Sequence, residues 1–257
     1  MSQFLSVFRY EFSMSVRRKG LWIAYLILFG FFGFVFVREG FDVSYTGGSP
    51  WQEAGTMVHM YNVLMPLIGG ILAADRMQRD YRLGVRELQT SAPLSHTVYI
   101  LGKYTGVLLS LLLPMLLWVL GLSVLAVALG LIGPAMIGAT IVAFAAIAVP
   151  SFAFVTAFSL ACPLVMPLRV YQILFTGYWF WGNFLNAQVF PTVSGTLLNS
   201  SGKYALEGFF QGTTSQNLDR PLHTPLEAWL NILVLGLSVT AVLFVLCQCL
   251  ARQSKRT

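Results

Sequence analysis

Charged residues are scarce in this sequence. Asp, Glu, Lys and Arg make up 10% of its 257 residues, whereas a soluble domain carries about 25%, so a water-solvated globule is excluded. The formal net charge is +6, which in a nucleic-acid-binding protein would form basic stripes beside a soluble core. Here the charges interrupt long apolar runs instead, and 56% of the residues are hydrophobic. The predicted surroundings are therefore lipid, and no nucleic-acid partner is expected.

The usual sequence signatures of catalysis are also missing. A nucleotide-binding Walker loop needs Gly-Lys followed by Ser or Thr, but Gly102-Lys103 precedes Tyr104 and Gly202-Lys203 precedes Tyr204. The three histidines lie in different segments without a His-Glu-x-x-His pattern, and no Gly-x-Ser-x-Gly elbow occurs. We therefore expect no enzyme activity and no cofactor in this chain.

Cysteines are too few for a secretory disulfide framework. The three, Cys162, Cys247 and Cys249, fall toward the expected cytoplasmic ends of helices, on the reducing side. Cys247 and Cys249 are two positions apart and so point to different helix faces, which makes a shared metal site poor geometry. They are predicted to be small apolar fillers, and no metal site is expected.

The apolar runs themselves predict transmembrane helices, because lipid cannot hydrogen-bond a bare backbone and a crossing needs about 20 apolar residues. The uncharged stretch from Tyr104 to Leu168 is 65 residues long, too long for one crossing, and Gly130 to Pro134 offers the break. The predicted fold class is an all-α polytopic membrane protein with six transmembrane helices, at about 21–37, 57–74, 99–129, 135–162, 170–190 and 228–251.

Basic residues set the expected orientation. With the N-terminus inside, only Arg38, Lys203 and Arg220 of the 16 Lys and Arg residues lie outside, which satisfies the positive-inside rule. Both termini are thus expected in the cytoplasm, with a basic tail at 252–257 and an outer loop at 191–227.

Residues 1–20 form a separate element before the first span. Phe4, Phe8, Phe12 and Val16 recur every four residues, the pattern of an amphipathic helix in the membrane interface. The alternative is a charged flank that happens to be helical.

Almost no ionisable group lies within the predicted spans, although ion pumps and proton-coupled carriers usually mark their pathway with such groups. Energy for any transport must then come from a partner. The polar residues that remain are either helix-to-helix contacts or the lining of a substrate path. The candidates for that path are Tyr61, Asn62, Tyr178, Asn183 and Asn186. Gly102 and Gly106 form a small-xxx-small pair, which predicts a packing notch.

The densest charge lies in a predicted cytoplasmic loop at 75–98. Its spacings of three, four and seven residues give helical faces that could carry salt bridges or dock on a partner. An ordinary positive-inside loop is the other interpretation, but topology needs none of its acidic residues. The candidate contacts are Asp75, Arg76, Arg79, Asp80, Arg82, Arg86 and Glu87.

These segments resemble the permease subunits of the type-2 ABC exporter family. The N-terminal part resembles that family's elbow helix in Phe8-Arg9-Tyr10-Glu11-Phe12 and Arg17-Arg18-Lys19-Gly20-Leu21-Trp22. The loop is similar in order and spacing in Asp75-Arg76, Arg79-Asp80, Gly84, Glu87-Leu88, Ser91-Ala92-Pro93-Leu94-Ser95, Tyr99 and Gly102-Lys103. His96 departs from the pattern, because a basic residue is expected after Pro-Leu-Ser.

The resemblance implies a function. The loop would contain a coupling helix that docks on a separate dimer of ABC ATPase subunits, which would bind ATP and Mg. A second permease copy or paralogue would complete a central path lined by spans two and five in the plasma membrane. Short re-entrant helices within Val193 to Phe210 would cap the outer exit, and a plain mobile loop is the other interpretation of this stretch. The alternative from another class is a non-transporting membrane anchor or immunity protein, whose basic loop binds a partner or anionic lipid.

Overall fold

A computed structural model describes residues 3–38, 49–82, 95–185, 189–212 and 223–254, and within these ranges the chain is helical without strands. The all-α prediction is confirmed for this part of the chain. The α-helices are α1 (Gln3–Val16), α2 (Lys19–Arg38), α3 (Pro50–Asn62), α4 (Met65–Ala73), α5 (Asp75–Arg82), α7 (His96–Ala128), α8 (Ala135–Ala143), α9 (Val149–Ala161), α10 (Leu168–Asn183), α11 (Lys203–Phe210) and α12 (Pro225–Ser254). Shorter helical segments are η2 (Phe144–Ala148), η3 (Cys162–Leu164) and η4 (Val193–Gly195).

Three of the described helices are long and apolar enough to cross a membrane. They are α7, the continuous run Ala135–Leu164 and Pro225–Arg252 of α12. The pair α3 and α4–α5 gives a fourth if the bent pair is one span, and the apolar stretch Lys19–Phe34 of α2 is shorter. The chain is thus a membrane-embedded helical protein, while the count of six spans stays a prediction.

The long uncharged run turns where the sequence predicted. Helix α7 ends at Ala128, and Gly130 adopts a left-handed φ of 70°. Leu131 N–H donates to Ala126 O and Gly130 N–H to Val127 O, which is the Schellman arrangement for a helix end. A side chain at Gly130 would be strained at this φ. The break predicted at Gly130 to Pro134 is confirmed.

The return helix contains a π-helical turn. Residues Phe144–Ala148 form the wide turn η2 between α8 and α9, and Pro150 follows in the first turn of α9. Proline has no N–H and its ring clashes with the carbonyl four residues earlier, and a π turn is one way in which a helix accommodates it. The run therefore stays continuous from Ala135 to Leu164.

The second predicted span is broken into two helices, whereas the sequence predicted one continuous run at 57–74. Helix α3 begins at 50, with the Ser49 side chain accepting from Gln52 N–H, and ends at Asn62. Helix α4 begins at Met65, and the two halves meet at 41°. Pro66 explains the break, because it cannot donate to the carbonyl of Asn62 four residues earlier.

Helix α10 is shorter than the predicted fifth span. Helix α10 has 16 residues and ends at Asn183, so it is about 24 Å long, whereas the predicted span runs to 190. Two carbonyls near its end accept bonds from hydroxyls of the following segment: Thr192 donates to Trp181 O, and Ser194 donates to Leu185 O at 2.7 Å. These bonds replace a further helical turn.

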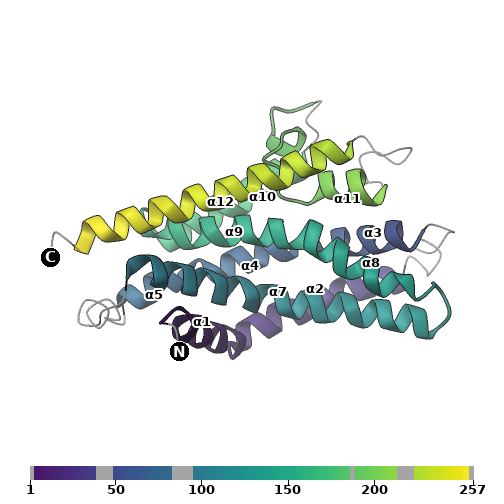
Figure 1. The fold of residues 1–257 in the computed structure, drawn as a ribbon, viewed down its shortest axis with the longest axis horizontal. Coiled ribbons are helices and arrows are strands. Elements are labelled where there is room, and N and C mark those ends of the chain that lie inside the picture. Colours follow the sequence, from purple (N-terminus) through teal and green to yellow (C-terminus); the bar gives the residue numbers. More distant parts are fainter. Residues whose placement is uncertain (1–2, 39–48, 83–94, 186–188, 213–222, 255–257) are drawn as a thin grey trace.

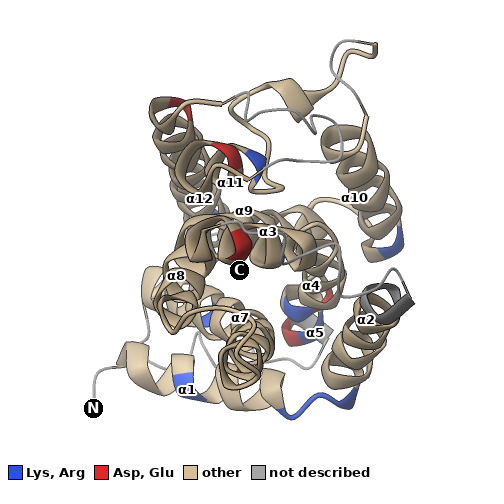
Figure 2. Ribbon diagram, turned by 90° about the vertical axis from the view of Figure 1, so that its right-hand side faces the viewer, with Lys and Arg blue, Asp and Glu red and all other residues tan. Residues whose placement is uncertain are grey.

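The helices run along one long axis, with α5 and the C-terminal end of α12 at one end of the bundle and the α7–α8 turn at the other (Figure 1). Seen along this axis, α1 lies beside α7 and α12 lies beside α11 (Figure 2), and α3 packs on α8 and α4 on α9. Tyr25 of α2 donates to Leu111 O of α7 at 2.8 Å. Ser123 of α7 and Thr140 of α8 share a hydrogen bond of 2.7 Å. Charged residues are few on the ribbon and several gather at α5.

Candidate functional site

A buried lysine connects three helices at the α5 end of the bundle. Lys103 of α7 is 1% exposed, and its Nζ lies 2.6 Å from Glu11 Oε1 of α1 and 2.6 Å from Asp80 Oδ2 of α5. Tyr99, one turn earlier on α7, donates its hydroxyl to the same oxygen of Asp80. A buried charge is tolerated only when it is paired and hydrogen-bonded. We call Lys103, Glu11, Asp80 and Tyr99 the Lys103 network.

A second ion pair holds the start of α5. Arg18, between α1 and α2, makes two bonds with the Asp75 carboxylate, of 3.0 and 2.5 Å, and donates to Leu72 O at 3.2 Å. Bidentate arginine–carboxylate pairs fix orientation as well as distance. Helix α5 is thus tied at Asp75 to the start of α2 and at Asp80 to α1 and α7.

Three of the predicted coupling residues are paired or buried inside the bundle. Asp75 and Asp80 are half-buried and paired, and Arg76 is buried. Arg79 is exposed on α5. Arg82 is the last residue of α5, while Arg86 and Glu87 lie outside the described residues. Of the described side chains, Arg79 is therefore the one placed to meet a partner.

Helix α1 sits against α7 at two glycines. A Cβ at Gly102 would lie 2.9 Å from Val7 Cβ, and one at Gly106 would lie 2.9 Å from both Phe8 O and Glu11 Cβ. Real Cβ atoms do not come this close to backbone atoms, so the two helices touch only because both positions lack a side chain. The predicted packing notch is confirmed, and it brings Glu11 to Lys103.

The predicted amphipathic stripe of α1 forms a row of rings. Phe8 stacks on Phe4 and Phe12, with ring centroids 6.4 and 6.0 Å apart. Phe4 is exposed, while Phe8 and Phe12 are half-buried. Residues 3–16 are helical as expected, and their place in a membrane interface stays a prediction.

The broken helix α3–α4 is bound to two other parts of the chain at its break. The Trp179 indole of α10, itself fully buried, donates to Val63 O at 2.8 Å. The Asn62 amide donates to Ser201 O at 2.7 Å. Carbonyls near a helix break need partners when buried, and α10 supplies one of them. The break therefore links α3–α4, α10 and the segment before α11.

Residues 193–210 contain the short helices η4 and α11, as expected. Their re-entrant course and their place at an outer exit stay predictions. The Asn231 amide of α12 donates to Leu197 O and Asn199 O at 2.8 and 2.9 Å, and Asn199 in turn accepts from Ser201 N–H at 2.9 Å. We call residues 193–210 the end segment.

Helix α11 also carries a buried carboxylate near a histidine. Glu207 is fully buried in its side chain and lies 3.9 Å from Lys203 and 3.9 Å from His223. Burial lowers the pKa of His223, and this effect outweighs the opposing effect of Glu207. His223 is thus neutral at pH 7, and it stacks on Tyr204 with centroids 3.8 Å apart.

The residues proposed for a substrate path lie in different surroundings. Tyr61 is buried among aromatic rings of α2, 5.1 Å from the Phe32 centroid, and Asn62 is buried against the end segment. On α10, Tyr178 is half-buried, and the Asn183 amide donates within its own helix to Trp179 O at 2.9 Å. Asn186 lies outside the described residues. Asn62 thus joins α3 to the segment before α11, and Asn183 bonds within its own helix. A substrate path lined by these residues stays a prediction.

Three important residues were not among the predicted site residues. Glu11 and Lys103 are far apart in sequence, and their pairing follows from how α1 seats on α7. Their signals were an acid in an otherwise basic flank and a lysine near the start of an apolar helix. Nothing in the sequence marks Trp179, because within an apolar run a buried tryptophan and a lipid-facing tryptophan look the same.

We expect Trp179→Phe to lower the free energy of unfolding by about 1–3 kcal/mol, because the part-buried carbonyl of Val63 at the helix break loses its donor. Thermal unfolding in detergent measures this change. Trp181→Phe is the matched control, since Trp181 lies two residues away on the same helix and is 42% exposed. Equal stability of the two variants would contradict a structural role for the bond to Val63.

Within the part of the chain that the structure describes, no three His, Cys, Asp or Glu side chains gather closely enough to hold a metal ion. The arrangement can instead transmit movement, because its polar contacts join helix ends and a helix break. Comparison of the sequence with protein-family models and with curated proteins finds no match.

Proposed function

We propose that this chain is the membrane-embedded permease subunit of an ATP-driven exporter, paired with a second permease and driven by a separate dimer of ABC ATPase subunits that binds ATP and Mg. The family resemblance of the 75–98 segment and the N-terminal flank motivates this proposal. The observation that carries it is the fixation of α5: Asp75 and Asp80 tie this helix to α1, α2 and α7.

The contacts suggest how a push on the segment after α5 would spread. Helix α5 follows α4 directly, and α4 leads to the break at Val63 and Leu64. From the break, the bond from Trp179 reaches α10 and the bond from Asn62 reaches the end segment. A displaced α5 would thus bend the broken helix and move α10 with it.

The placement of the charged parts supports the expected orientation. Helix α5 and the C-terminal end of α12 lie at the same end of the bundle (Figure 1), and the basic tail follows that end of α12. The positive-inside rule assigns such an end to the cytoplasm. An ATPase in the cytoplasm would then meet residues 75–98, and both termini would lie on its side of the plasma membrane.

Charge reversal at Arg79 tests the proposed ATPase contact. Its side chain is exposed on α5 and makes no ion pair among the described residues. We expect Arg79→Glu to weaken binding of the ATPase about tenfold or more, because a like charge replaces an attractive one at the interface. Glu87→Arg, from the same loop, should lower the coupled ATPase activity as well. The measurement is the amount and ATPase activity of the complex purified from native membranes.

Arg9→Glu is the matched control for this experiment. Arg9 is also exposed, on α1, so its reversal makes the same change in net charge without touching α5. Full retention of ATPase by Arg79→Glu and Glu87→Arg would contradict the proposed docking site. Reproducible absence of any ATPase from the unmodified complex would favour the membrane anchor or immunity protein instead.

A further inference from the structure

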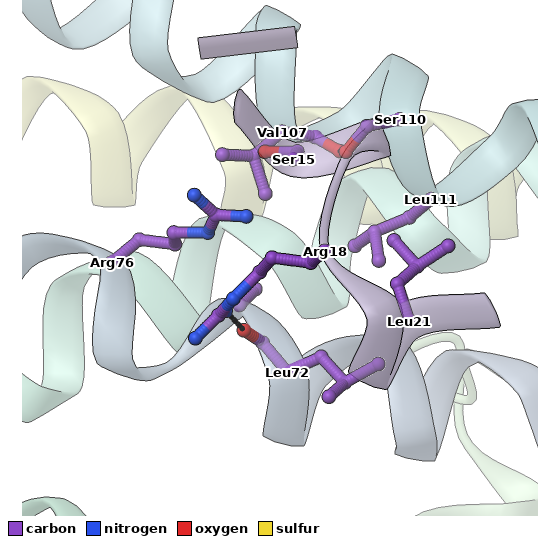
Figure 3. A pocket seen from close by; sticks show the side chains of 9 residues that line it. Ser15, Arg18, Leu21, Leu72, Arg76, Val107, Ser110 and Leu111 are labelled. Atoms are coloured by element: carbon purple, nitrogen blue, oxygen red, sulfur yellow. Dashed lines mark hydrogen bonds between the residues drawn. The ribbon is translucent and has the colours of Figure 1, made fainter. Parts of the chain in front are cut away.

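A small pocket lies one helical turn beyond the Lys103 network, between α1, the start of α2, the α4–α5 junction and α7 (Figure 3). Its polar lining consists of Ser15, Arg18, Arg76 and Ser110, and leucine, valine and alanine side chains complete it. The empty space is about 230 Å³ with its open mouth. The narrow part admits about one atom of water size.

Two buried polar groups in this pocket lack partners. Arg76 is 3% exposed, and its Nη1 has no hydrogen-bond acceptor among the described residues. Ser15 is 1% exposed, and its hydroxyl likewise has no partner there. Figure 3 shows the Arg76 guanidinium extending from α5 into the space beside Ser15. A buried donor without an acceptor costs about 1–3 kcal/mol, and more when it is charged, so a ligand that accepts both bonds would be stabilised.

The charge of the lining favours an anion over a cation. Two guanidinium groups line the pocket, and no carboxylate does. Arg18 is neutralised by Asp75, whereas Arg76 makes no ion pair within 4 Å in the described part of the chain. Glu11 of α1 is bound by Lys103 through Oε1. Its Oε2 has no hydrogen-bond partner among the described residues, but Glu11 does not line the pocket. The guanidinium fork suits the oxygens of phosphate groups in particular.

We propose that this pocket binds a phosphate-type oxyanion, with one oxygen between Arg76 Nη1 and the Ser15 hydroxyl and the rest of the group at the mouth beside Arg18. The anion would come from a lipid headgroup or from inorganic phosphate. Arg18 of the lining directly precedes α2 and its apolar run, and headgroups meet a membrane protein at such helix ends. This inference does not depend on the proposed transport function.

Thermal unfolding of the full chain, purified in dodecyl maltoside without lipid phosphate, tests the site. One arm titrates inorganic phosphate against chloride at equal ionic strength. The other adds phosphatidylglycerol against diacylglycerol, which lacks the phosphate. We expect a saturable rise in Tm of about 5 °C or more at about 100 times Kd in at least one arm. The arm that responds identifies the source of the anion.

The variants assign any response to this pocket. Arg76→Gln should abolish the shift, whereas Arg79→Gln should retain it, because Arg79 lies on the same helix with an exposed side chain. If Arg76→Gln does not fold, Ser15→Ala serves instead and should weaken the apparent affinity about tenfold through one lost bond to a charged group. Absence of a shift in both arms, which would leave only water in the pocket, overturns the proposal. So does a shift that persists in full in Arg76→Gln or Ser15→Ala.

Discussion

Replacement of Lys103 by methionine is expected to lower the free energy of unfolding by about 3–5 kcal/mol. The methionine fills a similar volume, but it leaves the carboxylates of Glu11 and Asp80 near each other without the ammonium that binds both at 2.6 Å. Removing one partner of a buried ion pair is far more costly than replacing the whole pair. Tm should fall by about 10 °C or more for a chain of this size.

Thermal unfolding in detergent measures the effect, and Arg169→Met is the control, because Arg169 is exposed and its removal changes the net charge equally. A triple variant that adds Glu11→Gln and Asp80→Asn should recover much of the loss, since no unpaired charge remains buried. If Lys103→Met were as stable as Arg169→Met, the network would not hold the three helices together.

The Lys103 network also shows where sequence reasoning stops. The spacing of the charges at Asp75 to Glu87 gives helical faces that allow either salt bridges or docking on a partner, and the resemblance to exporter permeases favoured docking. The structure places Asp75, Arg76 and Asp80 in contacts or burial inside the bundle. Spacing along a helix says which residues share a face but not what that face meets. Lys103, which donates to Asp80, lies 23 residues away from it, and Glu11 of α1, which accepts from Lys103, lies 92 residues away from Lys103.

Features that depend on nearby residues were predicted well. The turn at Gly130 and Pro134 follows from local backbone chemistry, since glycine permits the left-handed φ that ends α7. The start of α7 is local too, although it lies at His96 and not at the predicted 99, because the Ser95 side chain accepts from Val98 N–H and caps the helix. The notch at Gly102 and Gly106 needed only the spacing of two small residues on one face.

The break in α3–α4 was missed although its cause is visible in the sequence. Pro66 interrupts the run at 57–74, but a proline inside a transmembrane segment is tolerated when neighbours supply the missing bonds. Only the fold shows that Trp179 is such a neighbour. The early end of α10 likewise depends on Thr192 and Ser194, whose contacts form after the chain has turned.

A side chain at Gly106 is expected to lower the free energy of unfolding as much as the loss of Lys103 does, because it separates α1 from α7. In Gly106→Val the new Cβ would meet the backbone of α1 at Phe8 O, 2.9 Å away, and at Phe12 N, 3.1 Å away. Overpacking alone costs about 1–3 kcal/mol. Displacing α1 also withdraws Glu11 from Lys103, which leaves a buried ammonium with one carboxylate fewer.

Limited trypsin digestion follows the release of α1: the side chains of Arg9 and Arg17 are already exposed, but the helical backbone beside them becomes cleavable only when α1 leaves α7 and unfolds. Thermal unfolding gives the accompanying loss of stability. Gly121→Val is the matched control: it makes the same substitution on the same helix, where a Cβ meets nothing within 4 Å. Combining Gly106→Val with Glu11→Gln distinguishes the two contributions. Both changes remove the contact between Glu11 and Lys103. The double variant should therefore lose less stability than the sum of the losses in the two single variants. Full additivity would mean that the notch holds α1 without positioning Glu11, and the seat of α1 and the Lys103 network would then be separate features of the fold.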